Sequence, residues 1–404
     1  MMRQTRLTMT TVQNDRPSGQ ASGFVPALEG MRGLAAVGVL LTHVAFQTGT
    51  TSVPVIGAAL GRLDLAVAVF FALSGFLLWR PHAAAARGLR SRPSTRTYLL
   101  HRAARILPAY WLVVAVVLTL LPGAGGGVRL WLANLTLVQV FVPLTLTEGM
   151  TQMWSLSVEV AFYLLLPLFG LAMASLAGAR ARFRIPVILA VSVISLGWTF
   201  LPIATESGVN IENWMPGYLA WFGAGMIVAE AAANTAGDSV LVRIASRRWL
   251  LTGVAAVAFA VSSTPLAGEQ GLTTPAAWQF AMKVLLGAVV AFCLIAPLVL
   301  GVGVRTRWLA GPFALTIGRW SYGIFIWHLA VLAVVFPVLG IAPFDGQFLV
   351  LAGVTLALTL PVAAASYALV EEPVRVALRR REDRRRNGGI AASAAAATPS
   401  SAAS

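Results

Sequence analysis

The sequence contains little charge, one lysine and one cysteine. Only 11% of its 404 residues are charged, whereas 58% are hydrophobic and the mean hydropathy is +0.78. A soluble globular protein does not have this composition, so we expect a polytopic membrane protein. The single cysteine, Cys293, lies within an apolar segment, which excludes a disulfide framework and a cysteine cluster that binds metal. We therefore predict no metal site.

The charge that is present is mostly positive, with 30 basic residues, 15 acidic residues and a net charge of +15. Such an excess is also typical of nucleic-acid-binding proteins. Here, however, the arginines flank apolar segments, which is the distribution that the positive-inside rule describes. We therefore expect the lipid bilayer as a partner and no nucleic acid.

Ten apolar segments are candidates for transmembrane helices. They comprise about residues 30–48, 62–80, 107–121, 151–174, 185–203, 215–233, 250–266, 276–301, 320–340 and 347–370. If both termini are cytoplasmic, the outer loops hold only Arg62 and Arg129 of the basic residues, and Lys283 lies in a span. We therefore predict an all-α, multi-pass protein of the bacterial cytoplasmic membrane, with about ten transmembrane helices and both termini cytoplasmic.

Polar segments flank the apolar region at both ends. Residues 1–26 have no apolar core of their own, and we predict a disordered cytoplasmic leader. Residues 27–375 form the predicted membrane domain. Residues 376–404 begin with an arginine-rich stretch, which suits anionic lipid headgroups, and continue as an Ala/Ser-rich tail that we predict to be disordered and cytoplasmic.

The first apolar segment carries two ionisable side chains, Arg32 and His43. They are eleven residues apart, so at about 100° per residue they share one helix face and lie roughly 16 Å apart along its axis. Ionisable side chains within a bilayer are costly and usually face the bundle interior, where they have a function. The alternative is that Arg32 only anchors the helix at the membrane surface and that His43 hydrogen-bonds a neighbouring helix.

Two further patterns flank the most basic loop, which joins the second and third apolar segments. Before it, Ser74 and Gly75 are small residues among bulky ones, a composition that lets two transmembrane backbones approach closely. After it, Arg102 and Arg105 are spaced i and i+3, so their guanidinium groups share a helix face and could hold one phosphate cluster. The alternative for these arginines is ordinary positive-inside anchoring.

The segment that begins at Trp154 carries three polar groups on one helix face. Ser155, Glu159 and Tyr163 are spaced i, i+4 and i+8 in an otherwise apolar helix. A glutamate within a membrane span is a candidate for function. It could equally tie two helices together.

The ninth segment contains two polar residues on one face, and acidic residues follow the tenth segment. Ser321 and His328 are seven residues apart and therefore lie on one face, two turns from each other. The tenth segment ends in Glu371-Glu372-Pro373. Neither pattern names a reaction by itself.

In chain order, these patterns resemble the motifs of the membrane acyltransferase-3 family. The matching strings are Leu-Glu-Gly-Met-Arg with a histidine eleven residues after the arginine, Phe-Phe-x-Leu-Ser-Gly-Phe-Leu, Arg-x-x-Arg-Ile-x-Pro-x-Tyr-Trp, Trp-Ser-Leu-x-x-Glu-x-x-Phe-Tyr, Ser-Tyr followed by a histidine, and Glu-x-Pro. Phe325 stands where the family usually has a second tyrosine, so no role that needs a phenol is expected there.

The resemblance implies a membrane O-acyltransferase. Members of the family move acyl groups, mostly acetyl, from acyl-coenzyme A to hydroxyls of sugars, glycolipids or macrolides. We therefore expect acetyl-CoA or another acyl-CoA as a donor co-substrate, no tightly bound cofactor, and a hydroxyl-bearing glycan, glycolipid or macrolide as the acceptor.

The resemblance also implies roles for individual residues. His43 would be the general base that deprotonates a hydroxyl, or would carry the acyl group transiently. Glu159 would orient or charge His43, or bind the acceptor hydroxyl. The donor would be held by the arginines Arg32, Arg102 and Arg105, and the acceptor by Trp154, Ser155, Tyr163, Ser321 and His328.

A proton-coupled secondary transporter is the alternative function. In such a protein, a histidine and a glutamate within the membrane form a proton relay and no covalent chemistry takes place. Transporters of this length often contain internal repeats, and none is evident in this sequence. Release of free thiol from acetyl-CoA would distinguish an acyltransferase from a transporter.

Overall fold

The computed structural model describes residues 24–234, 240–271, 273–301 and 306–396. Within these residues every regular element is a helix and no strand occurs, so the all-α prediction is confirmed. Residues 1–23 of the predicted leader and residues 397–404 of the predicted tail lie outside the described part.

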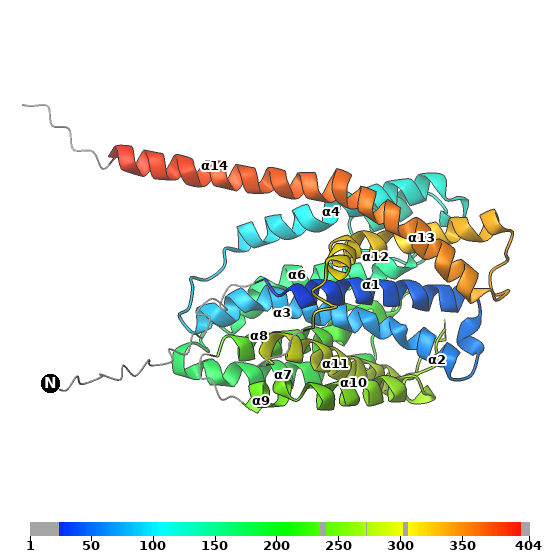
Figure 1. Cartoon of the computed structure of the whole chain (residues 1–404), viewed down its shortest axis with the longest axis horizontal. Helices are drawn as coiled ribbons and strands as arrows, with labels where there is room; N and C mark the ends of the chain where they lie inside the picture. The colour runs from blue at the N-terminus through cyan, green and yellow to red at the C-terminus, as the bar shows by residue number, and fades with distance from the viewer. Residues whose placement is uncertain (1–23, 235–239, 272, 302–305, 397–404) are drawn as a thin grey trace, which may run out of the picture.

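The helices form one bundle, in which most run along the long axis of the view in Figure 1. The α-helices are α1 (Pro26–Gln47), α2 (Ile56–Gly61), α3 (Ala66–Ala86), α4 (Thr95–Leu120), α5 (Val128–Leu135), α6 (Trp154–Ala172), α7 (Arg184–Ser195), α8 (Leu219–Ala232), α9 (Val240–Ser246), α10 (Arg248–Ser262), α11 (Ala277–Leu300), α12 (Pro312–Leu339), α13 (Phe348–Ser366) and α14 (Glu372–Ala396). A 3₁₀ turn, η2 (Arg62–Leu65), joins α2 to α3, and a π-helix, η10 (Tyr367–Glu371), joins α13 to α14.

Eight helical segments in the described residues are long and apolar enough to cross a membrane, or nine if α9 and α10, which meet at a bend of 81°, form one span. The chain is therefore a polytopic membrane protein. The segment predicted at 215–233 differs most from expectation, because α8 has only 14 residues, whereas a span needs ~20. The total of ten spans and the cytoplasmic position of both termini stay predictions.

Close backbone contact between α3 and α8 explains the small residues in α3. A Cβ on Gly75 would overlap the carbonyl oxygen of Phe222, and a Cβ on Gly225 would overlap that of Ala72. Glycine is therefore required at both crossing points, as the composition around Gly75 predicts. This crossing brings the middle of α3 into the centre of the bundle, where α1, α4, α6 and α12 also pass.

A buried ion cluster connects α3, α7 and α8. Glu230, which is fully buried, accepts a hydrogen bond from Arg184 at 2.6 Å, from Arg87 at 2.6 Å and from the indole of Trp79 at 2.7 Å. Three donors on two carboxylate oxygens compensate the desolvation of the charge. This cluster therefore holds three helices together.

The C-terminal segment begins as a helix. Residues 376–396 belong to α14, and Figure 1 shows this helix continuing beyond the edge of the bundle. Its composition favours a helix, because arginine and alanine are strong helix formers and α14 continues an existing helix. The disorder of the Ala/Ser-rich tail stays a prediction.

Candidate functional site

A cavity lies at the centre of the bundle, between α1, α3, α4, α6 and α12. It encloses about 640 Å³ of empty space, including the part that opens to solvent. Six residues that the sequence singles out line it, namely Arg32, Arg102, Arg105, Ser155, Glu159 and Tyr163. Three helices far apart in the chain thus place their predicted polar residues around one space.

Three arginines give the cavity a strongly positive wall. Arg32 comes from α1, and its Nη1 lies 3.9 Å from a carboxylate oxygen of Glu29. Arg102 and Arg105 come from one face of α4, and neither makes a hydrogen bond or ion pair with another described residue; the Nε of Arg102 is also buried. Buried donors without partners are costly, so this wall suits an anionic ligand with several acceptor oxygens.

Glu159 is held on the α6 side of the cavity by two hydroxyl groups. Its Oε1 accepts a hydrogen bond from Tyr163 at 2.6 Å and another from Ser74 of α3. No described residue donates to its Oε2. Glu159 therefore ties α6 to α3, as the structural alternative proposed, and still has one carboxylate oxygen available for a ligand.

His43 pairs with His328 and not with Glu159. The Nε2 of His328 lies 3.2 Å from the Nδ1 of His43, and the two ring centroids are 5.0 Å apart. His43 Nδ1 also lies 2.8 Å from the carbonyl oxygen of Val39, and His328 Nδ1 lies 3.0 Å from that of Ile324. Because a carbonyl can only accept, we assign a proton to each Nδ1, which leaves the Nε2 of His43 unprotonated.

The cavity lining contacts the histidine pair through Phe325. Phe70 and Phe325 both line the cavity, and their ring centroids lie 5.9 Å apart. The ring of Phe325 lies 6.1 Å from that of His328. His43 itself is not among the lining residues. The histidine pair therefore lies just behind an aromatic wall of the cavity.

A carboxylate, Asp64, lies near His43. Asp64 of η2 is within electrostatic reach of His43 and forms an ion pair with Lys283 of α11 at 2.6 Å. The hydroxyl of Thr42, next to His43, donates to the carbonyl oxygen of Gly61 at 2.7 Å and so fixes the end of α2, directly before η2, against α1. Lys283, the one lysine of the sequence, thus forms an ion pair with the acid that lies near His43.

Three of the predicted acceptor residues lie away from the cavity lining. Trp154 packs on Tyr218, with ring centroids 5.3 Å apart. Ser321 is only 1% exposed, and His328 is fully buried against His43. Of the five predicted acceptor residues, only Ser155 and Tyr163 line the cavity.

Ser74 and Tyr322 line the cavity but were not predicted as site residues. Ser74 donates to Glu159, and the hydroxyl of Tyr322 donates to the carbonyl oxygen of Ile106 at 2.9 Å. Both belong to strings that carry the family resemblance, so position within a motif could have identified them. Within the described residues, no group of three histidine, cysteine or acidic side chains is placed to hold a metal ion.

Comparison with known proteins places the chain in a family. A family model described as an acyltransferase domain matches residues 25–368. The acyltransferase MdmB of Streptomyces mycarofaciens is 28% identical over 331 residues, which cover 76% of this chain and 79% of that protein. The peptidoglycan O-acetyltransferase OatA of Listeria monocytogenes is 22% identical over 386 residues, which cover 87% of this chain but only 56% of that enzyme. No solved structure matches the chain.

Proposed function

Because this chain belongs to the acyltransferase-3 family and is an acyltransferase of groups other than amino-acyl groups, we propose that it transfers an acyl group from acyl-CoA to a hydroxyl. Acetyl is the proposed group, since one relative is named as an O-acetyltransferase. The secondary transporter is not retained, because both relatives are named as acyltransferases.

The arginine wall supports acyl-CoA as the donor. Coenzyme A carries phosphates, and each charge-assisted contact between a guanidinium and a phosphate contributes about 1.5 to 3 kcal/mol. Arg102 and Arg105 make no hydrogen bond or ion pair with another described residue, although Arg102 lies over the ring of Tyr163, and Arg32 has only a distant ion-pair partner. All three lie toward the ends of α1 and α4 that the charge distribution predicts to be cytoplasmic, where coenzyme A is made.

In the proposed reaction, the acceptor hydroxyl gives its proton to the Nε2 of His43. The hydroxyl oxygen then attacks the thioester carbonyl carbon, the carbon–sulfur bond breaks, and the sulfur leaves with the proton that His43 held. The products are an ester and free coenzyme A. His328 acts as a positioning residue, because its Nε2 accepts from the Nδ1–H of His43 and keeps that tautomer.

Glu159 is proposed to bind the acceptor. Its Oε1 is fixed by two hydroxyl groups, and its Oε2 is free to accept a hydrogen bond from a second hydroxyl of the acceptor, since the reacting hydroxyl gives its proton to His43. Ser155 and Tyr163 line the same wall. The proposed acceptor is a glycan, glycolipid or macrolide, and the proposed location is the bacterial cytoplasmic membrane.

The experiment that tests this function measures release of thiol. Purified protein in detergent is incubated with acetyl-CoA and a panel of hydroxyl acceptors, and free thiol and acylated product are measured together. We expect both to appear in equal amounts with at least one acceptor, and not with the His43→Ala variant. Equal thiol release by wild-type protein and His43→Ala would contradict the proposal.

A further inference from the structure

Glu371 is a buried carboxylate that no direct contact explains. It is only 5% exposed, and its Oε1 is buried without a hydrogen-bond partner among the described residues. It is the last residue of the π-helix η10. Single π turns within longer helices are frequent at functional sites.

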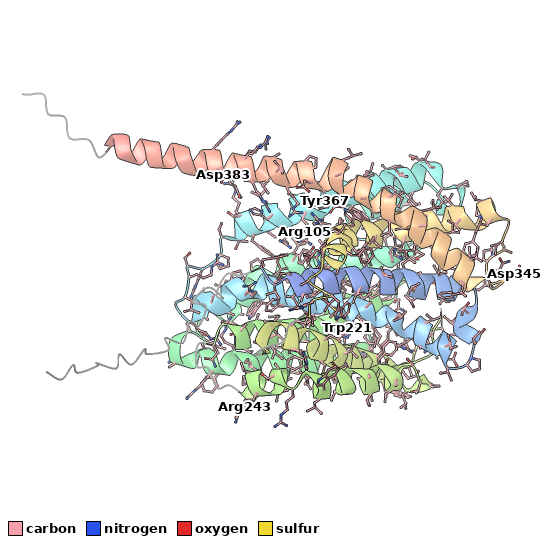
Figure 2. All side chains as sticks on the ribbon, in the orientation of Figure 1. Arg105, Trp221, Arg243, Asp345, Tyr367 and Asp383 are labelled. Atoms are coloured by element: carbon pink, nitrogen blue, oxygen red, sulfur yellow. The ribbon has the colours of Figure 1, made fainter. Side chains whose placement is uncertain are left out.

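Two of the three arginines around Glu371 belong to the positive wall of the cavity. Arg105, Arg375 and Arg32 are the cations within electrostatic reach of its carboxylate. The π-helix packs against α4 and α12, and Figure 2 labels Arg105 of α4 close to Tyr367, the first residue of η10. Glu371 therefore lies within electrostatic reach of two of the three arginines that line the cavity, Arg32 and Arg105.

The arginines need a counter-charge when no ligand is present. Cations that share a low-dielectric site repel one another, and each loses hydration. Glu29 meets Arg32 at 3.9 Å, but neither Arg102 nor Arg105 has a carboxylate in contact. A buried carboxylate within reach of both Arg32 and Arg105 lowers this cost without occupying their hydrogen-bonding positions.

We propose that Glu371 is the resident counter-ion of the donor site, which stabilises the empty arginine cluster and competes with the phosphates of the donor for its charge. This inference rests on the proposed function. It assigns Glu371 a role opposite in sign to that of the arginines, because its charge repels the phosphates. Glu371 thereby weakens binding of coenzyme A and favours its release after transfer.

The test measures the dissociation constant of coenzyme A for purified protein by calorimetry at low salt. In Glu371→Gln the repulsion is removed, so we expect the dissociation constant to fall about fivefold or more. Glu371→Asp keeps the charge and should bind like wild type. Glu372→Gln is the matched control, because it removes the adjacent, exposed carboxylate and should leave binding unchanged. Unchanged or weaker binding by Glu371→Gln overturns the inference.

Two further measurements keep the outcomes distinct. If Glu371→Gln does not fold, Glu371→Met, which fills a similar volume with an apolar side chain, takes its place with the same expectation. Wild-type protein that binds neither coenzyme A nor inorganic pyrophosphate would overturn the proposed donor and this inference together. Wild-type binding that Arg105→Ala weakens and Glu371→Gln leaves unchanged would overturn the inference alone.

Discussion

Two groups of charged side chains inside this bundle, one buried and one lining the cavity, differ in how completely their polar atoms are paired. In the Glu230 cluster, both carboxylate oxygens accept hydrogen bonds, from Arg87, Arg184 and Trp79. In the cavity, Arg102 and Arg105 have no hydrogen-bond or ion-pair partner among the described residues.

This difference indicates that the paired group stabilises the fold and that the unpaired group is available for function. The desolvation cost of paired charges is offset by their attraction to each other. Such charges therefore hold helices in place and are unavailable to a ligand. Unpaired charges are retained at a cost that a ligand can remove. Both groups contain arginines that the sequence alone presents as similar basic residues. Only their partners distinguish an arginine that can bind a ligand from one that stabilises the packing of the helices.

The largest effect is expected when the paired cluster loses its carboxylate. Glu230→Gln leaves Arg87 and Arg184 without a counter-charge, and removal of one partner from a buried ion pair costs about 3 to 5 kcal/mol. We expect a marked fall in melting temperature and in yield, measured by thermal unfolding in detergent. Glu269→Gln, which changes an exposed acid, is the control. A Glu230→Gln protein as stable as this control would contradict the assignment.

Substitution in the histidine pair should lower activity without lowering stability. His43→Ala is expected to lower kcat by about 100-fold or more, because general base catalysis contributes at least that much. The protein should remain folded and inserted. His82→Ala is the matched control, because His82 stacks on Trp79 beside the paired cluster and not beside the cavity. More than about a tenth of wild-type activity in His43→Ala would exclude the role as general base.

A smaller effect is expected at Glu159. Glu159→Gln removes the charge from Oε2 but retains the contacts to Ser74 and Tyr163, so we expect kcat to fall about tenfold while the donor KM is unchanged. Steady-state kinetics with varied acetyl-CoA measure both constants. Glu206→Gln, an exposed acid, serves as the control. A raised donor KM with an unchanged kcat would place Glu159 in the donor site instead.

The sequence predicted the helices and much of the cavity, because both depend on local patterns. Long apolar segments predict helices in a membrane, and polar residues on one face of such a helix turn toward the interior. For that reason Arg32, Arg105 and Glu159, from three different helices, line one space.

The partners of these residues could not be predicted, because they depend on how helices cross. His43 and His328 are 285 positions apart, and nothing in the periodicity of either helix states that they meet. For Glu159 the sequence left open a contact with His43, a contact with the acceptor and a link between two helices, and only the packing of α3 against α6 shows that Ser74 is its partner. Likewise, the spacing of Ser321 predicted its helix face but not that α12 would bury it away from the cavity.

The most direct test of the distinction between the two groups replaces one arginine from each by alanine. Coenzyme A binding and melting temperature are measured for Arg105→Ala and Arg184→Ala in the same detergent. We predict that Arg105→Ala raises the dissociation constant about 10- to 100-fold with little change in melting temperature. Arg184→Ala should lower the melting temperature and leave the dissociation constant of the folded fraction unchanged. Loss of binding in Arg184→Ala, together with wild-type binding in Arg105→Ala, would contradict the account.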